Sequence, residues 1–413
     1  MEMIKRFSIY GFLKNLQFFE PFLILFFLSL GLNYLNIALL ISFRAICVNI
    51  MEIPSGALAD IYGKKNAMII SLLSYIISFI IFSFSKNYLL LFPAMFFFSI
   101  GEAFRTGTHK AMIFQWLEHN NRTEEKTKIY GYTRSWSKKG SALSVLLSSL
   151  IVIFSKNYQW IFIFSIIPYI IGIWNISAYP SYLNEKHENR KGVIKTIFNH
   201  LFKSIKTIVK SNPLKKLIVQ TTVFEGSFSV SKDYLQPIIQ TQIITIGAVL
   251  AFPEKESTAI LIGAVYFILH LLSSSASKNA HKFSQRINND KKAISHLIFA
   301  AFILLGISGI GFYYNLYILP ISCFIAYYMV QNIWRPIAIS QYDNYSRKEE
   351  QATILSVESQ SKSLGIIILS PIAGYLADNV GIHGSLIMIT GVLLSLWLFS
   401  KFFKVPSSNT NQV

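Results

Sequence analysis

The sequence predicts an all-α membrane protein with about twelve transmembrane helices, arranged as two bundles of six. Apolar segments of about twenty residues recur along the whole chain, and each is long enough to cross a bilayer as a helix. Hydrophobic residues make up 53% of the chain and charged residues only 14%, whereas a soluble domain averages roughly 25% charged residues. The chain therefore lacks the polar surface that a soluble protein needs.

The apolar segments of this 413-residue chain give the expected helices in order. The first segment is not followed by the small residues of a signal-peptide cleavage site, so we expect it to be retained. Several segments exceed the bilayer thickness, which implies tilted helices or protruding ends. The predicted spans are residues 10–31, 34–59, 65–84, 88–117, 129–154, 159–178, 213–246, 257–281, 292–312, 315–340, 352–377 and 383–403.

Basic residues account for the net charge of +18, and they gather in alternate loops. External loops carry only Lys86, Lys156 and Lys255, which is the positive-inside pattern. The charge therefore indicates topology, with both termini cytoplasmic, and no nucleic-acid partner is expected. Richness in Lys, Ile and Asn is typical of a low-GC bacterium, so we expect a multi-pass protein of the bacterial plasma (inner) membrane. The predicted cytoplasmic loops carry Lys5, Arg6, Lys64, Lys65, Arg122, Lys126, Lys128, Lys278, Lys282, Arg286, Lys291, Lys292, Arg347, Lys348, Lys401 and Lys404.

The longest polar segment divides the chain into two halves. We expect an N-terminal six-helix bundle at residues 1–180, a basic cytoplasmic linker at 181–212 and a C-terminal six-helix bundle at 213–413. Apolar residues at helical spacing between Ile194 and Ile208 predict an amphipathic helix on the inner membrane surface. This helix either binds lipid or a partner, or simply joins the halves.

A short motif separates the second and third predicted spans: Gly56-Ala-Leu-Ala-Asp60-Ile-Tyr-Gly63-Lys64-Lys65. Gly63 can take a positive φ for a tight turn, and Lys64 with Lys65 marks the cytoplasmic side. The motif resembles the signature loop of the major facilitator superfamily, which lies between transmembrane helices two and three. The resemblance implies two six-helix bundles around a central cavity, with Gly56, Asp60, Gly63, Lys64 and Lys65 forming a gate.

In the gate that this resemblance implies, Asp60 contacts the start of the eleventh span near Thr353, and Lys65 pairs with an acidic residue. Ile61 stands where the family usually has a basic residue, so the gate has one charged contact fewer than is usual. Residues 374–381 resemble a second copy of the motif. The helix count places them at the external end of span eleven, so we interpret them as a helix end and a turn.

Ionisable residues inside the predicted spans are candidate functional residues, because each costs at least about 2.5 kcal/mol in hydrocarbon. The resemblance implies that spans one, four, seven and ten line the cavity, which selects Glu20, Arg105, Glu225, Lys232 and Arg335. For each residue, a structural ion pair or a packing role is the alternative. The full set of cavity candidates is Glu20, Arg44, Glu102, Arg105, His109, Glu225, Lys232 and Arg335.

The candidates suggest distinct roles. Arg44 lies too deep to reach the interface, so it binds an anionic group or pairs with a carboxylate. One helix face carries Glu102, Arg105 and His109. These residues either relay protons or lie in a hydrated contact between packed helices. Glu20 and Glu225 are the proposed proton sites, since a desolvated carboxylate beside a cation can titrate near ambient pH.

Other charged residues in the spans have plainer interpretations. We interpret three basic residues of span five as anchors at the membrane interface: Arg134, Lys138 and Lys139. We expect Glu358 to form an ion pair with Lys362, one helical turn further along span eleven. Cys47 and Cys323 lie far apart and His270 stands alone, so neither a metal site nor a cofactor is expected.

These observations favour a monomeric secondary transporter, not an enzyme, that moves a small organic solute by alternating access and is coupled to protons. An anionic or zwitterionic solute, such as a metabolite or siderophore, fits the excess of basic residues. The alternatives are a multidrug/proton antiporter, a polytopic membrane enzyme and a non-transporting sensor. Span five lacks the Gly-Pro signature of drug antiporters, and the short loops lack a catalytic pair. The expected partners are the solute, protons and membrane lipids.

Overall fold

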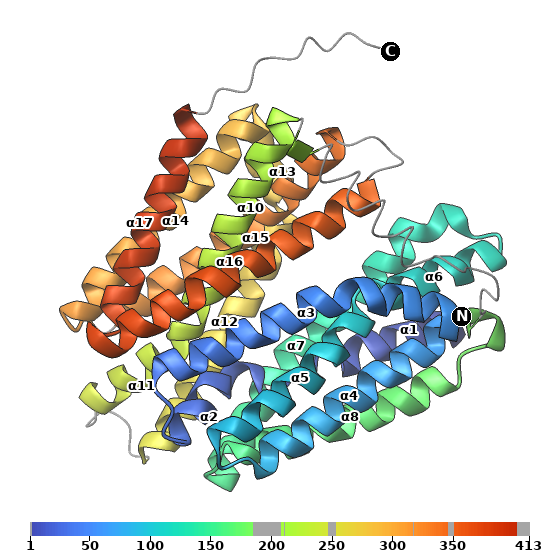
Figure 1. Ribbon diagram of the computed structural model, residues 1–413, viewed down its shortest axis with the longest axis horizontal. Coiled ribbons are helices and arrows are strands. Elements are labelled where there is room, and N and C mark those ends of the chain that lie inside the picture. The colour runs from blue at the N-terminus through green and yellow to red at the C-terminus, as the bar shows by residue number, and fades with distance from the viewer. Residues whose placement is uncertain are drawn as a thin grey trace. The chain divides into compact units, whose positions relative to one another are not determined.

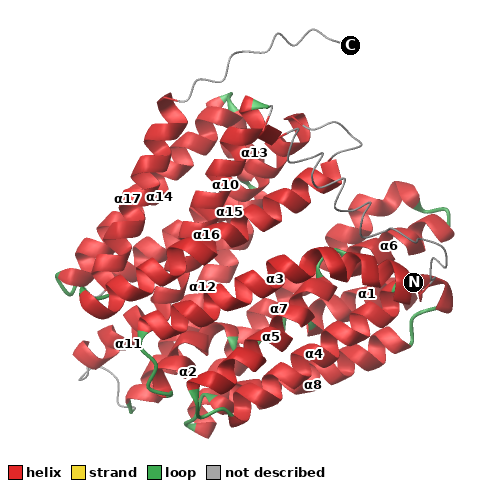
Figure 2. Cartoon of the chain, in the orientation of Figure 1, coloured by secondary structure: helices red, strands yellow, loops and turns green. Residues whose placement is uncertain are grey.

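The computed structural model describes residues 2–184, 208–209, 211–246, 253–316, 318–345 and 351–402. These residues are almost entirely helical and include no strand (Figure 2), so the all-α prediction is confirmed. Most of the expected amphipathic linker helix falls outside these ranges, as do Arg347, Lys348 and Lys404.

Eight of the described segments are long and apolar enough to cross a membrane. They coincide with eight of the predicted spans. Their helices are α3 (Tyr34–Tyr62), α4 (Lys64–Phe84), α5 (Tyr88–Arg105) continued by α6 (Thr108–His119), α7 (Lys126–Ser155), α8 (Gln159–Ser177), α12 (Glu254–Lys278), α14 (Asp290–Tyr313) and α17 (Ile382–Phe402). A short helix, α13 (Ala280–Ile287), follows α12.

The four remaining predicted spans are interrupted or carry charged residues. The first comprises α1 (Glu2–Leu13), the 3-10 turn η1 (Glu20–Phe22) and α2 (Leu23–Ser29). The seventh comprises α10 (Asn212–Ser231), the turn η4 (Lys232–Tyr234) and α11 (Leu235–Ile246). The tenth and eleventh are α15 (Ile318–Tyr345) and α16 (Gln351–Asn379), which contain Arg335, Glu358 and Lys362.

The chain forms two compact units. Unit 1 comprises Met1–Lys195 with Asp233–Leu272, and unit 2 comprises Thr196–Lys232 with Ser273–Val413. The C-terminal bundle at 213–413 stays a prediction, and in the division into compact units α11 and most of α12 group with unit 1. Local contacts explain this grouping. The helix α11 packs on α2. The helix α12 lies close to α7, since a Cβ added to Gly263 of α12 would be 2.5 Å from the Ser149 hydroxyl of α7.

Within unit 1, α4 packs against α3, α5 and α8, while α1 packs against α7 and α8 (Figure 1). The core between these helices is aromatic: Phe162 of α8 stacks on Phe82 with ring centroids 4.9 Å apart. Within unit 2, α14 packs against α15 and α17, and α10 packs against α16. Each unit is thus a helix bundle with its own core.

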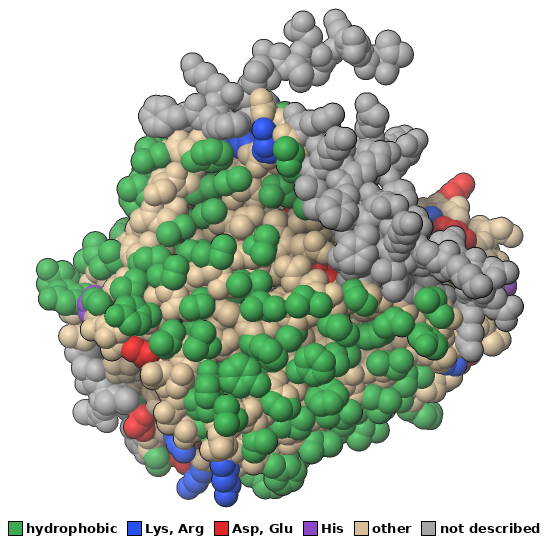
Figure 3. Space-filling model, viewed as in Figure 1, with side chains coloured by type: hydrophobic (Ala, Val, Ile, Leu, Met, Phe, Trp, Pro, Cys, Tyr) green, Lys and Arg blue, Asp and Glu red, His purple; other side chains and the backbone are tan. Residues whose placement is uncertain are grey.

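Large apolar side chains also point outward. On α8, Ile167, Ile170 and Trp174 are 52%, 54% and 74% exposed. Figure 3 shows hydrophobic side chains over most of the visible face, with Lys and Arg side chains near its margins. A soluble protein rarely exposes so much apolar surface, so these helices are suited to contact lipid.

Candidate functional site

A buried ion cluster lies in unit 2, where α10, α15 and α16 meet. Glu225 of α10 has no exposed surface. Its carboxylate lies 3.3 Å from the Lys362 ammonium and 3.6 Å from the Arg335 guanidinium, and it accepts a hydrogen bond of 2.9 Å from Gln331. Three helices therefore converge on one carboxylate in a low-dielectric surrounding, where such interactions are strong.

A second carboxylate completes the cluster. Glu358 of α16 is 2% exposed and accepts two hydrogen bonds from Arg335, at 2.5 and 3.2 Å. Arg335 thus bridges two buried carboxylates with the two-pronged geometry that favours arginine over lysine. The two acids and two bases balance in charge.

This pairing corrects one expectation. We expected Glu358 to pair with Lys362 along one helix, but among the described residues Lys362 pairs with Glu225 instead. The close crossing of α10 and α16 explains the exchange, because a Cβ on Gly226 would lie only 2.8 Å from the Cα of Gly365. Lys232, another of the predicted cavity residues, lies at the end of α10 and makes no ion pair in the described residues.

A polar cavity of about 260 Å³ lies in unit 1 between α1, α6 and α7. The α7 residues on its wall follow a helical spacing of three and four, so they form one continuous face. The lining residues are Phe7, Gly11, Lys14, Asn15, His109, Ile113, Tyr130, Thr133, Arg134, Ser137, Lys138 and Ser141. None of the described residues that line the cavity is acidic. Arg134 and Lys138, which we interpreted as interfacial anchors, line this cavity, and both residues are exposed.

Arg105 and His109 lie near this cavity but not on one helix. We expected a continuous helix over 88–117, whereas α5 ends at Arg105 and Gly107 has a φ of 78°. Arg105 lies over the Tyr75 ring at 5.6 Å from its centroid. The His109 ring packs against the Tyr10 ring in a tilted arrangement, with centroids 4.1 Å apart. The break turns the two side chains to different neighbours, because the positive φ at Gly107 redirects the chain.

The other predicted cavity residues are scattered. Glu20 is exposed at the first position of η1. Arg44 lies midway along α3, and its guanidinium is 5.4 Å from the centre of the Phe98 ring. Glu102 lies on α5 and forms no ion pair with Arg105 among the described residues. All three residues belong to unit 1, whereas the residues of the ion cluster belong to unit 2.

The signature motif builds the turn between α3 and α4. Gly63 has a φ of 91°, as predicted. Lys64 donates to the Gln115 amide oxygen at 3.0 Å. Lys65 donates to the carbonyls of Ser177 and Tyr179 at 2.6 and 3.0 Å.

This geometry changes part of the expected gate. We expected Lys65 to meet an acidic side chain, but it binds the carbonyl end of α8, where the helix dipole favours a cation. Gly56 lies within α3. The side chain of Asp60 is outside the described part of the chain, so its contact with the start of α16 stays a prediction.

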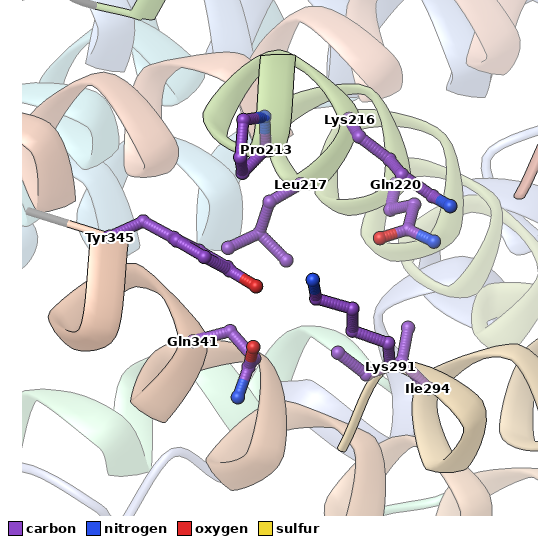
Figure 4. Close-up of a pocket in the computed structure, with 8 residues that line it drawn as sticks. All are labelled: Pro213, Lys216, Leu217, Gln220, Lys291, Ile294, Gln341 and Tyr345. Atoms are coloured by element: carbon purple, nitrogen blue, oxygen red, sulfur yellow. The ribbon is translucent and has the colours of Figure 1, made fainter. Parts of the chain in front are cut away.

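A smaller pocket of about 30 Å³ in unit 2 lies between α10, α14 and α15 (Figure 4). The Lys291 ammonium and the Tyr345 hydroxyl point toward its centre, whereas Lys216 donates to the Ser400 carbonyl at 2.6 Å. This volume is about that of a single water molecule. The pocket is therefore too small to hold an organic solute.

The largest of these spaces, about 710 Å³, is a crevice on unit 1 between α7, α8 and residues 13–18. Its lining is apolar except for Ser155, so it offers no partner for a charged group. No cluster of three His, Cys, Asp or Glu residues that could hold a metal ion occurs in the searched, described ranges.

Comparisons with known proteins agree with the all-helical fold. The sequence profile of the Major Facilitator Superfamily matches residues 9–361. The chain belongs to this superfamily. It is therefore a multi-pass membrane protein of a transporter family rather than an enzyme, and the resemblance inferred from the signature motif is confirmed.

Individual relatives of this major facilitator protein are distant. The uncharacterized MFS-type transporter YxaM of Bacillus subtilis (strain 168) is 21% identical over 394 residues, which cover 91% of this chain and 89% of that protein. The solved nucleoside transporter NupG has a TM-score of 0.78 at 12% identity, with 98% of this chain and 99% of that chain covered. The peptide transporter POT in complex with sulfate has a TM-score of 0.73 at 12% identity, with 96% and 93% covered. At these identities, the solved structures show a common fold.

Sequence reasoning found Glu225 and Arg335 but missed the cavity on α7. The signal was present in the spacing of Tyr130, Thr133, Arg134, Ser137 and Lys138, which places hydroxyl and basic groups on one face. We considered only the basic members of this set, so the face was overlooked.

Proposed function

We propose that this protein is a proton-coupled secondary transporter of a small organic solute, either anionic or zwitterionic. It acts as a monomer by alternating access in the bacterial plasma membrane, with both termini cytoplasmic. The observation that carries the proposal is the buried carboxylate of Glu225, which contacts both Lys362 and Arg335. The comparisons support transport of a small organic solute, since proteins of similar fold include transporters of nucleosides and peptides.

The ion cluster suggests how a proton could be coupled to a change of conformation. Protonating Glu225 removes one of two negative charges, so Glu358 would be left to face the two positive charges of Lys362 and Arg335. Removing one member of a buried ion pair leaves an uncompensated charge, which is costly. A proton on Glu225 therefore favours a rearrangement in which Lys362 or Arg335 meets another anion, such as a solute group. Glu20 is the second proton candidate, although it is exposed and lacks such a cluster.

The test is solute transport in proteoliposomes with an imposed pH gradient. Panels of organic anions, zwitterions, neutral solutes and cations would be screened with a pH-sensitive dye inside the vesicles. For the solute found, Glu225→Gln should lose accumulation driven by the pH gradient while keeping solute exchange at equal pH. Glu118→Gln is the matched control, because Glu118 pairs with Lys126 in an exposed contact.

The possible outcomes distinguish the proposed transporter from the alternative functions. Accumulation by Glu225→Gln at the wild-type level would contradict the role of Glu225. Extrusion of diverse organic cations would favour the multidrug antiporter. Ligand binding without flux would favour a sensor.

A further inference from the structure

The cavity of unit 1 gathers positive charge, and its wall carries no acidic residue from the described part of the chain. Lys14 lies within electrostatic range of Arg105 and Arg134, and Lys138 within range of Arg134 and Glu20. Lys14, Arg134 and Lys138 make no ion pair with any residue of the described ranges. Like charges held this close repel one another, so the arrangement favours any anion that enters.

The backbone brings these charges together. A Cβ on Gly140 of α7 would lie 2.4 Å from the carbonyl oxygen of Phe12, and one on Gly11 would lie 2.9 Å from the Ser137 hydroxyl. The backbones of α1 and α7 therefore almost touch. This close approach places Lys14, just after α1, opposite Arg134 and Lys138 on α7.

Neutral hydrogen-bonding groups fill the spaces between the charges. The Ser137 hydroxyl donates weakly to the Thr133 carbonyl at 3.4 Å, and the Ser141 hydroxyl lies 3.5 Å from the Asn15 amide oxygen. These long contacts are weak, so both hydroxyls can turn to donate to a bound oxygen atom. Guanidinium, ammonium and hydroxyl donors around a space are the chemistry that holds a carboxylate or phosphate group.

We propose that this cavity is the anion subsite of the transported solute, and that it takes a small dianion, a phosphomonoester or a dicarboxylate, through Lys14, Arg134 and Lys138. Three cationic side chains without an acidic residue favour two negative charges over one. A cavity of about 260 Å³ holds such a group. This inference rests on the proposed transport function but adds the charge class of the solute and the residues that recognise it.

Binding of defined anions to the full chain in phosphatidylcholine nanodiscs tests the inference. The probes are inorganic phosphate, glycerol 3-phosphate, succinate, lactate and a zwitterionic amino acid, each titrated at constant ionic strength while the thermal transition is followed. The dianions should raise the transition saturably, because a ligand that binds the folded state stabilises it. Lactate should bind about tenfold more weakly, since one charged hydrogen-bond partner is lost.

Arg134 and Lys139 lie on the same helix, α7, so they provide a matched test and control. Lys14→Gln and Arg134→Gln should each weaken dianion binding by about tenfold or more. Lys139→Gln should leave it unchanged, because the Lys139 ammonium lies over the Trp136 ring at 4.9 Å and does not line the cavity. Equal transitions without ligand would show that the variants are folded.

The outcomes separate this inference from the transport proposal. Equal dianion affinity in wild type, Lys14→Gln and Arg134→Gln overturns the inference, even where proton-driven transport of another solute is measured. Selective loss in the two cavity variants supports it, even where Glu225→Gln accumulates solute normally. If phosphatidylglycerol but no soluble dianion stabilises the wild type, and the cavity variants lose that effect, the site holds a lipid headgroup and the inference is overturned.

Discussion

Gly226 of α10 and Gly365 of α16 lie directly against each other. A Cβ on Gly226 would be 2.8 Å from the Cα of Gly365, and a Cβ on Gly365 would be 2.2 Å from the carbonyl oxygen of Thr222. Glu225 is next to the first glycine and Lys362 is one turn before the second. The closeness of the two backbones is therefore what allows Glu225 and Lys362 to meet.

Gly365→Ala should destabilise unit 2, because the added methyl group forces α10 and α16 apart. Overpacking of this kind costs roughly 1–3 kcal/mol. A lower thermal transition of the purified protein would measure the loss. Gly391→Ala on α17 is the control, since nothing lies within 4 Å of its Cβ position. Similar transitions for both variants would mean that the two helices do not pack as described.

Arg335→Met should be strongly destabilising, because it leaves Glu225 and Glu358 facing each other with Lys362 as their only cation. Breaking a buried ion pair costs about 3–5 kcal/mol, and the lower end is expected here because the Arg335 side chain is 34% exposed. Chemical denaturation monitored by Trp fluorescence measures the change.

Two further variants test whether the loss of stability in Arg335→Met comes from unpaired buried charge. The double variant Arg335→Met with Glu358→Met removes a charge of each sign, so it should recover part of the stability that the single variant loses. Arg122→Met should change little, because the Arg122–Glu125 pair lies on an exposed turn. If the single and double variants were equally unstable, the loss would come from packing and not from unpaired charge.

The helices could be predicted because their signal is local. A run of about twenty apolar residues fixes a transmembrane helix regardless of its neighbours, and all eight long apolar segments were found. The turn at Gly63 was predicted for the same reason, since a glycine between two apolar runs can take a positive φ. The break at Gly107 was missed because its polar surroundings, Arg105 to Lys110, lie between two apolar stretches that we joined into one span.

The candidate site depends on contacts between distant segments, which spacing along one helix cannot give. The sequence suggested that Glu358 pairs with Lys362, because these residues are four apart. Instead, Glu358 pairs with Arg335 of α15, and Lys362 pairs with Glu225 of α10. That exchange follows from the crossing of α10 and α16, and no local pattern in the sequence encodes the crossing.

Gln236→Ala should loosen the interrupted first span. The Gln236 side chain accepts from the Ile24 amide at 2.9 Å and donates to the Glu20 carbonyl at 3.0 Å, so it satisfies backbone groups that the η1 turn leaves unpaired. Unsatisfied buried groups cost about 1–3 kcal/mol. Hydrogen exchange should be faster at Ile24, and the thermal transition lower.

A neighbouring glutamine is the control for that change. Gln240 lies one turn further along α11, and its amide donates to Glu254 in an exposed contact of 3.1 Å. Gln240→Ala should leave exchange at Ile24 unchanged. If hydrogen exchange at Ile24 were unchanged in Gln236→Ala as well, water would replace the hydrogen bonds of the Gln236 side chain without a loss of stability.

Gly63→Ala and Gly56→Ala test the two glycines of the signature motif against each other. Gly63 has a φ of 91°, and a Cβ there would lie 2.2 Å from the Asn184 side chain. The substitution should lower stability by at least about 1–2 kcal/mol. Gly56 lies in α3 with nothing within 4 Å of its Cβ position, so Gly56→Ala should be neutral or slightly stabilising. Thermal transitions in the reversed order would contradict this account of the turn.

Cysteine labelling tests the predicted orientation in the membrane. Tyr62 is 55% exposed and Lys86 is exposed, and they flank α4, whose 21 residues span roughly 30 Å. In a background without Cys47 and Cys323, a membrane-impermeant maleimide should label Lys86→Cys in intact cells. Tyr62→Cys should be labelled only after permeabilisation, because the positive-inside pattern places Lys64 and Lys65 in the cytoplasm. Labelling of Tyr62→Cys alone in intact cells would invert the topology, and equal labelling of both would mean that α4 does not cross the bilayer.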